Sequence, residues 1–533
     1  MRINLNIWTL IILVVFVFIG NAQGLDLSKQ PLSLIPYTGP EKIGQSPREL
    51  ITFLDNVQIN TDNTSHLQNE EMVCINPTNT DNAVAVWRDF RLGYRRIGIG
   101  YTFDGGQTWV DTLLVPYSPY ERQSDPILWV DRDGVFYISG LDLYWGEGPS
   151  GISVYTSSDG GVTWSEPTWV IQEQYDYFED KQWFTIDQSG GPADGNIYCV
   201  WDRFAADYSG TGIVGATSTD GGLTFSEPIA ISIFGPDYTQ WPTVTVGPLS
   251  EVYVAWYDHR RPRRISMAIS SDYGVSYGPE FGFVTLDSAY SELNGELTSF
   301  PFPAMACDVY PESDNYGRLY VVYADGPFDW DMWVVWSDDG GDTWSNKVRI
   351  NDDQQYNGSD QFHPWISIDN DGVIHVCFFD RRDDPDNNLL YNLYYTRSVD
   401  GGQTWEENHR VSTVSSNPAH AALAGLIGEY IGISAWNGNV QMVWTDIRNF
   451  NQDVFSARID ASFTPGDVNN NQEVLSSDVD YLVAYLRGDR MPPDPPMWRA
   501  DANGDCLIDA ADIIYLTLYL QGNGPSPING NCR

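Results

Sequence analysis

An eight-residue motif recurs six times in this chain and restricts the possible folds more than any other feature. It begins with Ser or Thr, has Asp at its third and Gly at its fifth position, and ends with Thr or Ser before an aromatic residue, as in Thr102 to Trp109. Gly permits the positive φ of a tight turn, and the Asp and Thr side chains can bond backbone amides across it. Each copy therefore predicts a hairpin turn; the other copies are centred on Asp159, Asp220, Asp272, Asp339 and Asp400.

A second pattern, an apolar strand that ends in an acidic residue, recurs between these motifs. Its copies are Val86 to Asp89, Val200 to Asp202, Ala255 to Asp258, Val322 to Asp325, Phe378 to Asp380, Val443 to Asp446 and, more loosely, Val135 to Asp142. Another strand precedes each copy, so each unit has four strands. The seventh unit lacks the eight-residue motif, and Asn56 to Asn60 can supply its missing outer strand. We therefore predict an all-β, seven-bladed β-propeller, with six blades as the alternative, because a closed ring leaves no exposed sheet edge.

The eight-residue motif resembles the Asp-box, or BNR, repeat of the sialidase superfamily, and the resemblance covers roughly residues 50–460. It implies a propeller but not one function, because glycosidases, lectin-like proteins and receptors share it. Two hypotheses stay open: a sialidase-like glycoside hydrolase that acts on extracellular polysaccharide, and a non-catalytic propeller that binds glycan or protein. The seven-blade count and the absence of an Arg-Ile-Pro motif near the first blade depart from classical sialidases.

Candidate catalytic residues follow from the same resemblance, which implies a Tyr activated by a Glu and an Asp acid/base. Glu429 and Tyr430 match the first pair by composition, and Asp180 is the candidate acid. Consecutive residues of a strand point to opposite faces, which counts against Glu429 and Tyr430 acting together.

Arginine is concentrated in the loops after the acid-ended strands, which should lie on the face opposite the Asp-boxes, here called the front. A basic rim on an acidic chain would attract a carboxylated or sulfated glycan. Five arginines follow their strand-end Asp at nearly constant spacing, which favours a structural brace between neighbouring blades: Arg91, Arg203, Arg260, Arg381 and Arg448. The predicted ligand contacts are those that break this repeat, with aromatic and His residues where inner strands begin: Arg95, Arg96, Arg263, Arg264, Trp183, Trp241 and His363.

The C-terminal segment changes to two loop-and-helix units whose loops carry oxygen ligands at the spacing that calcium requires. Predicted ligands in the first loop are Asp467, Asn469, Asn471, Glu473 and Asp478, and in the second Asp501, Asn503, Asp505, Leu507 (through its carbonyl), Asp509 and Asp512. Apolar residues at helical spacing follow each loop. The duplication resembles a type I dockerin over residues 466–523, which implies bound calcium and a cohesin-type partner on a scaffold or cell surface.

The remaining organisation follows from composition. Residues 1–22 read as a signal peptide, which predicts a secreted protein with no membrane span after cleavage. An extension (23–49), the propeller (50–460), a linker (461–465), the dockerin-like domain (466–523) and a tail (524–533) follow. A net charge of −43 excludes nucleic acid as a partner. Four cysteines read as buried thiols (Cys74, Cys199, Cys307 and Cys377), whereas Cys506 and Cys532 can pair.

Overall fold

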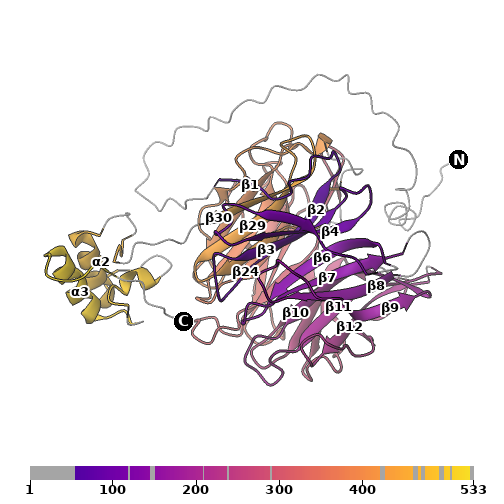
Figure 1. Cartoon of the computed structure of the whole chain (residues 1–533), viewed down its shortest axis with the longest axis horizontal. Helices are drawn as coiled ribbons and strands as arrows, with labels where there is room; N and C mark the ends of the chain where they lie inside the picture. Colours follow the sequence, from indigo (N-terminus) through magenta and orange to yellow (C-terminus); the bar gives the residue numbers. More distant parts are fainter. Residues whose placement is uncertain are drawn as a thin grey trace. The chain divides into compact units, whose positions relative to one another are not determined.

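The computed structural model describes residues 55–117, 120–144, 150–207, 209–236, 239–287, 291–299, 301–420, 426–459, 466–469, 474–490, 497–504 and 507–527. The predicted signal peptide, extension and linker, and the predicted Cys506–Cys532 pair, lie outside these residues. Between residues 55 and 459 the described chain forms seven four-stranded antiparallel sheets, which are the blades of a propeller (Figure 1). The four cysteines of the propeller are free and buried, as predicted.

The first six blades use their strands in chain order from the inside outward. Blade 1 consists of β2 (Gln68–Ile75), β3 (Ala83–Asp89), β4 (Arg96–Thr102) and β5 (Val110–Leu113). Blade 2 consists of β6 (Arg122–Val130), β7 (Phe136–Leu143), β8 (Ser150–Ser157) and β9 (Thr168–Gln174). Blade 3 consists of β10 (Tyr177–Ile186), β11 (Ile197–Ala205), β12 (Thr211–Ser218) and β13 (Ile229–Ala230). Blade 4 consists of β14 (Thr239–Val246), β15 (Val252–Asp258), β16 (Arg264–Ser270) and β17 (Phe281–Thr285). Blade 5 consists of β20 (Ala304–Cys307), β21 (Leu319–Asp325), β22 (Asp331–Ser337) and β23 (Val348–Arg349). Blade 6 consists of β24 (Gln361–Ile368), β25 (Ile374–Asp380), β26 (Asn392–Ser398) and β27 (His409–Arg410). A hairpin of β18 (Ser291–Leu293) and β19 (Leu297–Ser299) lies between blades 4 and 5 in the chain.

The seventh blade joins the two ends of the propeller. It contains β28 (Gly432–Trp436), β29 (Asn439–Asp446) and β30 (Asp453–Ile459), and its outer strand is β1 (Val57–Gln58). Asn60 strengthens this closure, because its Oδ1 accepts a bond from the Val454 amide at 2.9 Å and its Nδ2 donates to Asp453 Oδ1 at 3.1 Å. The prediction of seven blades, closed by the N-terminal strand, is confirmed.

The six Asp-box motifs form hairpin turns between the third and fourth strands, as their residues predict. In the first, Asp104 Oδ1 accepts a bond from the Thr108 amide at 2.9 Å, and Gly106 has a φ of 83°. The Gly106 amide in turn donates to the Thr102 hydroxyl at 3.1 Å. The same set of bonds recurs in the last copy, around Asp400. These side chains are fully used within their own turns, so their role is structural.

Most of the predicted arginine braces lie within a blade rather than between neighbouring blades. Arg91 pairs with Asp89 and with Asp111, both at 2.7 Å and both in blade 1. Arg448 pairs with Asp446 of its own blade at 2.7 Å. The acid is the last paired residue of the second strand, so the arginine two residues later folds back onto its own sheet.

Two of the five braces differ from the prediction in their partners. Arg203 binds Glu179 at 2.6 Å, because in blade 3 the acid of the brace lies on the inner strand, directly opposite Arg203 of the second strand. In blade 6 the strand-end Asp380 pairs with Arg382 at 2.8 Å, while the buried Arg381 donates to the Asn388 carbonyl at 2.8 Å.

The C-terminal module contains the helices α2 (Ser476–Leu486) and α3 (Ala510–Leu520) and the short 3-10 helix η3 (Met497–Ala500). Both predicted helices are confirmed. Leu482 and Leu516 of the predicted apolar stripes are buried in its small core. Gly488 and Gly522 follow the helices with φ values of 75° and 70°, as helix-terminating glycines do. None of the helices in the described part of the chain is long and apolar enough to cross a bilayer.

Candidate functional site

A β-bulge interrupts five of the inner strands at the front of the propeller. At each bulge the pairing register shifts and one residue other than Gly has a positive φ: Glu70, Asp125, Lys181, Trp241 and His363. Such a conformation is uncommon for these residue types and is found at bulges that re-aim a side chain. Here it brings Glu70, Asp125 and Lys181, from three neighbouring blades, into contact.

Lys181 is the centre of this buried charged group. Its Nζ lies 3.0 Å from Asp125 Oδ2 and 3.6 Å from Glu70 Oε1, and it also forms an ion pair with Glu429. Arg88 Nη1 adds a contact of 2.9 Å to Glu70 Oε1. We call these residues, with Asp180, the front cluster: Glu70, Arg88, Asp125, Asp180, Lys181 and Glu429.

The members of the front cluster differ in their protonation. Burial raises the pKa of Glu70, although Arg88 and Lys181 oppose this. Burial would also raise the pKa of Asp125, but Lys181 and Arg88 outweigh it and the pKa falls below its usual value. Burial disfavours the charge of Lys181, yet the surrounding carboxylates raise the pKa of Lys181 well above its ordinary value. Lys181 therefore stays charged and holds the carboxylates together.

Asp180 is the half-buried carboxyl group of the cluster. Burial raises the pKa of Asp180 to about 7; the charges of Asp125 and Glu429 add to this, against Lys181. The neighbouring Asp202 is fully buried, and its Oδ2 accepts a bond from the Trp241 amide at 3.1 Å. A partly accessible carboxyl group that keeps its proton near neutral pH is suited to general acid catalysis.

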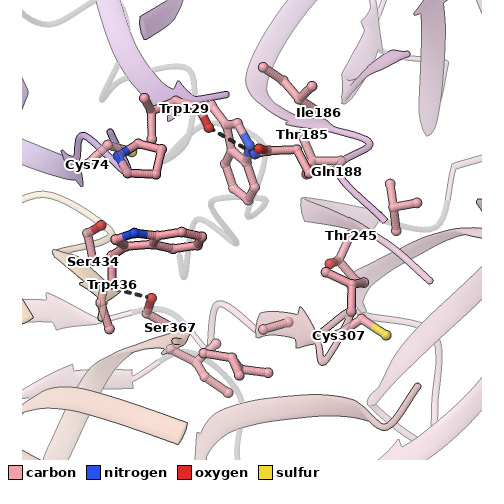
Figure 2. A pocket seen from close by; sticks show the side chains of 18 of the residues that line it. Cys74, Trp129, Thr185, Ile186, Gln188, Thr245, Cys307, Ser367, Ser434 and Trp436 are labelled. Carbon is pink, nitrogen blue, oxygen red and sulfur yellow. Dashed lines mark hydrogen bonds between the residues drawn. The ribbon is translucent and has the colours of Figure 1, made fainter. Parts of the chain in front are cut away.

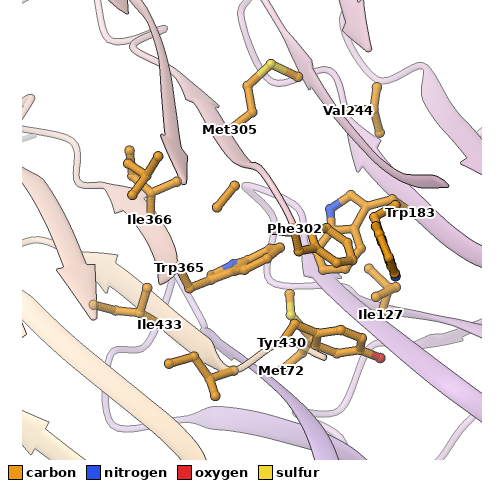
Figure 3. Close-up of a cluster of buried hydrophobic side chains, with 14 of the residues drawn as sticks. Met72, Ile127, Trp183, Val244, Phe302, Met305, Trp365, Ile366, Tyr430 and Ile433 are labelled. Atoms are coloured by element: carbon orange, nitrogen blue, oxygen red, sulfur yellow. The ribbon is translucent and has the colours of Figure 1, made fainter. Parts of the chain in front are cut away.

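Tyr430 lies in an aromatic plug beneath the cluster. Its ring centroid is 5.5 Å from Trp183 and 6.3 Å from Phe302, and Trp365 completes the plug (Figure 3). The Tyr430 hydroxyl donates to the Pro126 carbonyl at 3.1 Å. Burial, and then the charges of Glu70 and Asp125, raise the pKa of Tyr430 well above its usual value. Tyr430 precedes β28, so strand alternation does not separate it from the cluster, but this environment opposes the phenolate that a nucleophile needs.

The four arginines predicted to bind ligand fall into two pairs. Arg96 donates to the Leu114 carbonyl, and Arg264 Nε lies 2.9 Å from Asp258 Oδ2, so the structure gives both of them internal partners. Arg95 and Arg263 have no such partner among the described residues. Burial, and then the charge of Arg88, lower the pKa of Arg95. Arg95 is therefore a half-buried cation beside the front cluster that can accept an anionic group.

The aromatic and His residues predicted to contact a ligand are buried instead. Trp183 belongs to the plug, and Trp241 packs against Tyr257 with centroids 5.7 Å apart. Both ring nitrogens of His363 lack a hydrogen-bond partner among the described residues, and burial lowers the pKa of His363 to about 3. These side chains support the mouth from below and offer no exposed stacking face.

Sequence reasoning missed Glu70, Arg88, Asp125 and Lys181 as members of one site. For Glu70, Asp125 and Lys181 the signal is their position, two residues before the apolar part of an inner strand resumes. Pro follows this position in blades 2, 4 and 6, as in Asp125-Pro126.

Replacement of Lys181 by Met should lower the free energy of unfolding of the propeller by about 3–5 kcal/mol, because three buried carboxyl groups lose their shared cation. Denaturant unfolding followed by tryptophan fluorescence measures this. Lys347→Met is the matched control: its pair with Asp325 is 3.9 Å long and its side chain is 41% exposed, so the loss should stay below about 1 kcal/mol. Equal effects of the two substitutions would contradict the role given to Lys181.

The first predicted calcium loop is described in part, since Asn471 and Glu473 lie outside the described residues. Asp478 Oδ1 accepts a bond from the Asn469 amide at 2.9 Å, and Oδ2 accepts one from Leu475 at 2.8 Å. Burial raises the pKa of Asp478, and the charge of Asp467 adds to this. Two neighbouring carboxylates in a loop of oxygen donors fit a hard divalent cation such as calcium.

The second loop repeats this arrangement, with Asp505 outside the described residues. Asp512 accepts bonds from the amides of Asn503 (3.2 Å) and Asp509 (2.9 Å). The Asp509 carboxylate instead caps α3 by accepting a bond from the Ala511 amide at 2.6 Å. Among the described residues no three His, Cys, Asp or Glu side chains gather closely enough to hold a metal ion.

Fold and site together define a seven-bladed propeller with a buried charged cluster at its front, followed by a helical module with two loops of oxygen donors. The module corresponds to a known family: residues 465–521 match the dockerin type I domain. A sialidase from Clostridium perfringens is 23% identical to this chain over 166 residues, which cover 29% of this chain and 43% of the sialidase. The chain thus spans less than half the length of that relative.

Two solved structures are similar to this chain at low TM-score and low sequence identity. A sialidase from Streptococcus pneumoniae has a TM-score of 0.41 and 10% identity, over 76% of this chain and 94% of its own. An alpha-L-arabinanase from Penicillium chrysogenum has a TM-score of 0.43 and 12% identity, over 77% of this chain and 98% of its own.

Proposed function

We propose that the propeller is a glycoside hydrolase that acts on an extracellular polysaccharide at the front cluster. The observation that carries this proposal is the pair of Asp180, whose pKa is raised to about 7, and Glu429, whose charge contributes to that shift. A carboxyl group that keeps its proton near neutral pH, with a second carboxyl group close enough to influence its pKa, is what acid-assisted glycoside cleavage requires.

In this proposal Asp180 donates its proton to the oxygen of the leaving sugar. Glu429, held by its ion pair with Lys181 and 12% exposed, is the second carboxylate. Arg95 receives an acidic group of the substrate, which makes a carboxylated or sulfated polysaccharide the favoured class. Tyr430, whose hydroxyl donates to the Pro126 carbonyl, is a structural part of the floor of the site.

A panel of neutral, uronate-containing, sialylated and sulfated glycans tests the proposal. We expect new reducing ends or free sialic acid from an anionic member of the panel, measured by reducing-sugar assay and mass spectrometry. Binding of a glycan without cleavage would instead support the alternative of a non-catalytic glycan-binding propeller. If no member of the panel is bound or cleaved, both the hydrolase proposal and the glycan-binding alternative are contradicted.

We further propose that the C-terminal module binds two calcium ions and a cohesin-type partner, which would attach the secreted protein to a scaffold or cell surface. Asp467, Asn469 and Asp478, and Asp501, Asn503 and Asp512, would hold the ions, with the remaining loop oxygens. Exposed apolar side chains on the helices support a partner surface, because such groups mark protein interfaces; they include Leu486, Ile514, Leu518 and Leu520.

A further inference from the structure

Behind the aromatic plug, the channel of the propeller contains a cavity of about 450 Å³ (Figure 2). Met72, Trp183 and Trp365 line its inner end, and these residues separate it from the front cluster. Its outer end lies among the turns that join first and second strands, such as the one at Gly190, on the face that also carries the Asp-boxes. The cavity is therefore a second site, distinct from the front.

One wall of this cavity is aromatic. Figure 2 shows the indole rings of Trp129 and Trp436 directed into the space from β6 and β28. Tyr310 extends this wall, with its ring centroid 6.0 Å from that of Trp436. Flat aromatic faces at a cavity suit the apolar C–H face of a sugar ring, which loses water on stacking.

The opposite wall offers unused hydroxyl groups. Thr185 and Thr245 lie in adjacent blades, and Thr245 faces Trp436 across the cavity (Figure 2). Their side chains are buried, with exposures of 2% and 8%, and neither hydroxyl has a hydrogen-bond partner among the described residues. At the same position in blades 6 and 7, Ser367 and Ser434 each accept a bond at 3.0 Å from an amide of the next blade.

The hydroxyls of Thr185 and Thr245 differ from those of Ser367 and Ser434, because they accept no bond from a neighbouring blade. Because the Thr185 and Thr245 hydroxyls make no bond within the described protein, a ligand in the cavity can bond to them without breaking one. Thr185 and Thr245 can each donate and accept one such bond. The cavity thus presents hydrogen-bonding groups on one side and aromatic faces on the other.

The walls are also electrically neutral. Among the lining residues Arg132 is the one charged side chain, and it is paired at the surface with Asp194 at 2.7 Å. Burial raises the pKa of the Cys74 and Cys307 thiols, which keeps them uncharged. An ionised ligand would find no counter-charge here, and its burial would be costly.

We propose that this rear cavity binds a neutral sugar, either a monosaccharide or the end of an oligosaccharide, stacked on Trp129 or Trp436 and bonded to Thr185 and Thr245. The volume lies near the lower end of the range for small-ligand sites, about 300–1,000 Å³, which limits the ligand to one or two sugar rings. The proposal is independent of the hydrolase activity at the front.

The full chain is titrated with neutral disaccharides of glucose, galactose and arabinose, and with glucuronic acid as the charged comparison. Saturation-transfer NMR and tryptophan fluorescence detect binding. We expect saturable binding of at least one neutral disaccharide and weaker or no binding of glucuronic acid. Thr185→Val combined with Thr245→Val should weaken the neutral binding about tenfold, the value of two lost hydrogen bonds.

Asp180→Asn at the front should leave this binding unchanged, which separates the two sites. If the threonine variant loses thermal stability, Trp436→Leu gives a second test and should weaken binding by a similar factor. The proposal is overturned if no neutral sugar binds at tens of millimolar, if the threonine and tryptophan variants bind normally, or if Asp180→Asn alone removes the binding.

Discussion

Asp180→Asn is expected to lower kcat of polysaccharide cleavage by about 10²–10⁴-fold, the usual contribution of a general acid. The amide has nearly the shape of the carboxyl group but no proton to donate. Because burial raises the pKa of Asp180 to about 7, the wild-type acid is protonated below that pH and loses its proton above it. The rate should therefore fall about tenfold per pH unit on the alkaline side, and this limb should disappear in the variant.

Asp176→Asn provides the matched control, since Asp176 lies four residues earlier, in the turn that precedes β10, and is exposed. Its variant should keep both the rate and the pH profile of the wild type. Measurement of kcat and KM from pH 5 to 9 for the three proteins distinguishes the two positions. An Asp180→Asn protein that retains its rate, or that retains the alkaline limb, would remove Asp180 from the role of acid.

Chelation of calcium is expected to abolish binding of a cohesin domain and to unfold the C-terminal module while the propeller stays folded. The loops hold paired carboxylates, such as Asp467 and Asp478, that repel one another without a cation. A metal site formed only in the folded state contributes its binding free energy to folding, about 10 kcal/mol or more in strongly coupled cases. Circular dichroism and calorimetry with EDTA, then with added calcium, measure the loss and the recovery.

Substitutions in the two calcium loops test whether calcium binding at these loops causes the effects of chelation. Asp478→Ala and Asp512→Ala should each lower the calcium-dependent melting temperature and weaken binding to a panel of immobilised cohesin domains. Asp480→Ala, on the exposed side of α2, is the control and should change neither. Helix content and melting that do not respond to EDTA in the wild-type protein would show that the module folds without calcium.

The strand pattern predicts the fold because it is set by local chemistry repeated seven times. The blades are defined by the Gly of each Asp-box turn and by the acid at the end of each second strand. Their closure is indicated by residues 56–60, whose sequence is similar to that of a later outer strand, residues 347–351. Features that depend on contacts between strands are harder to predict from the sequence. In blade 3, for example, the acid of the brace is Glu179 of the inner strand, which preserves the ion pair with Arg203 but breaks the sequence pattern.

The front cluster could be predicted only in part for a related reason. Asp180 and Glu429 could be predicted because the resemblance to sialidases implies an Asp acid/base and a Glu beside a Tyr. Glu70, Asp125 and Lys181 meet only because each bulge turns a side chain towards the axis, and a bulge leaves little trace in the sequence beyond a following Pro in some blades. Trp241 and His363 have the residue types of a ligand site, but packing decides their exposure.

The pairing of β1 with β30 has a consequence for how the protein is made. The first strand of the ring stays unpaired until the strand that ends at Ile459 has been synthesised, since β30 is the neighbour to which it binds. A chain cut short before Asp453 would leave blade 7 with an open edge on each side of the gap. The ring of the propeller can therefore close only after the last strand of blade 7 has been synthesised.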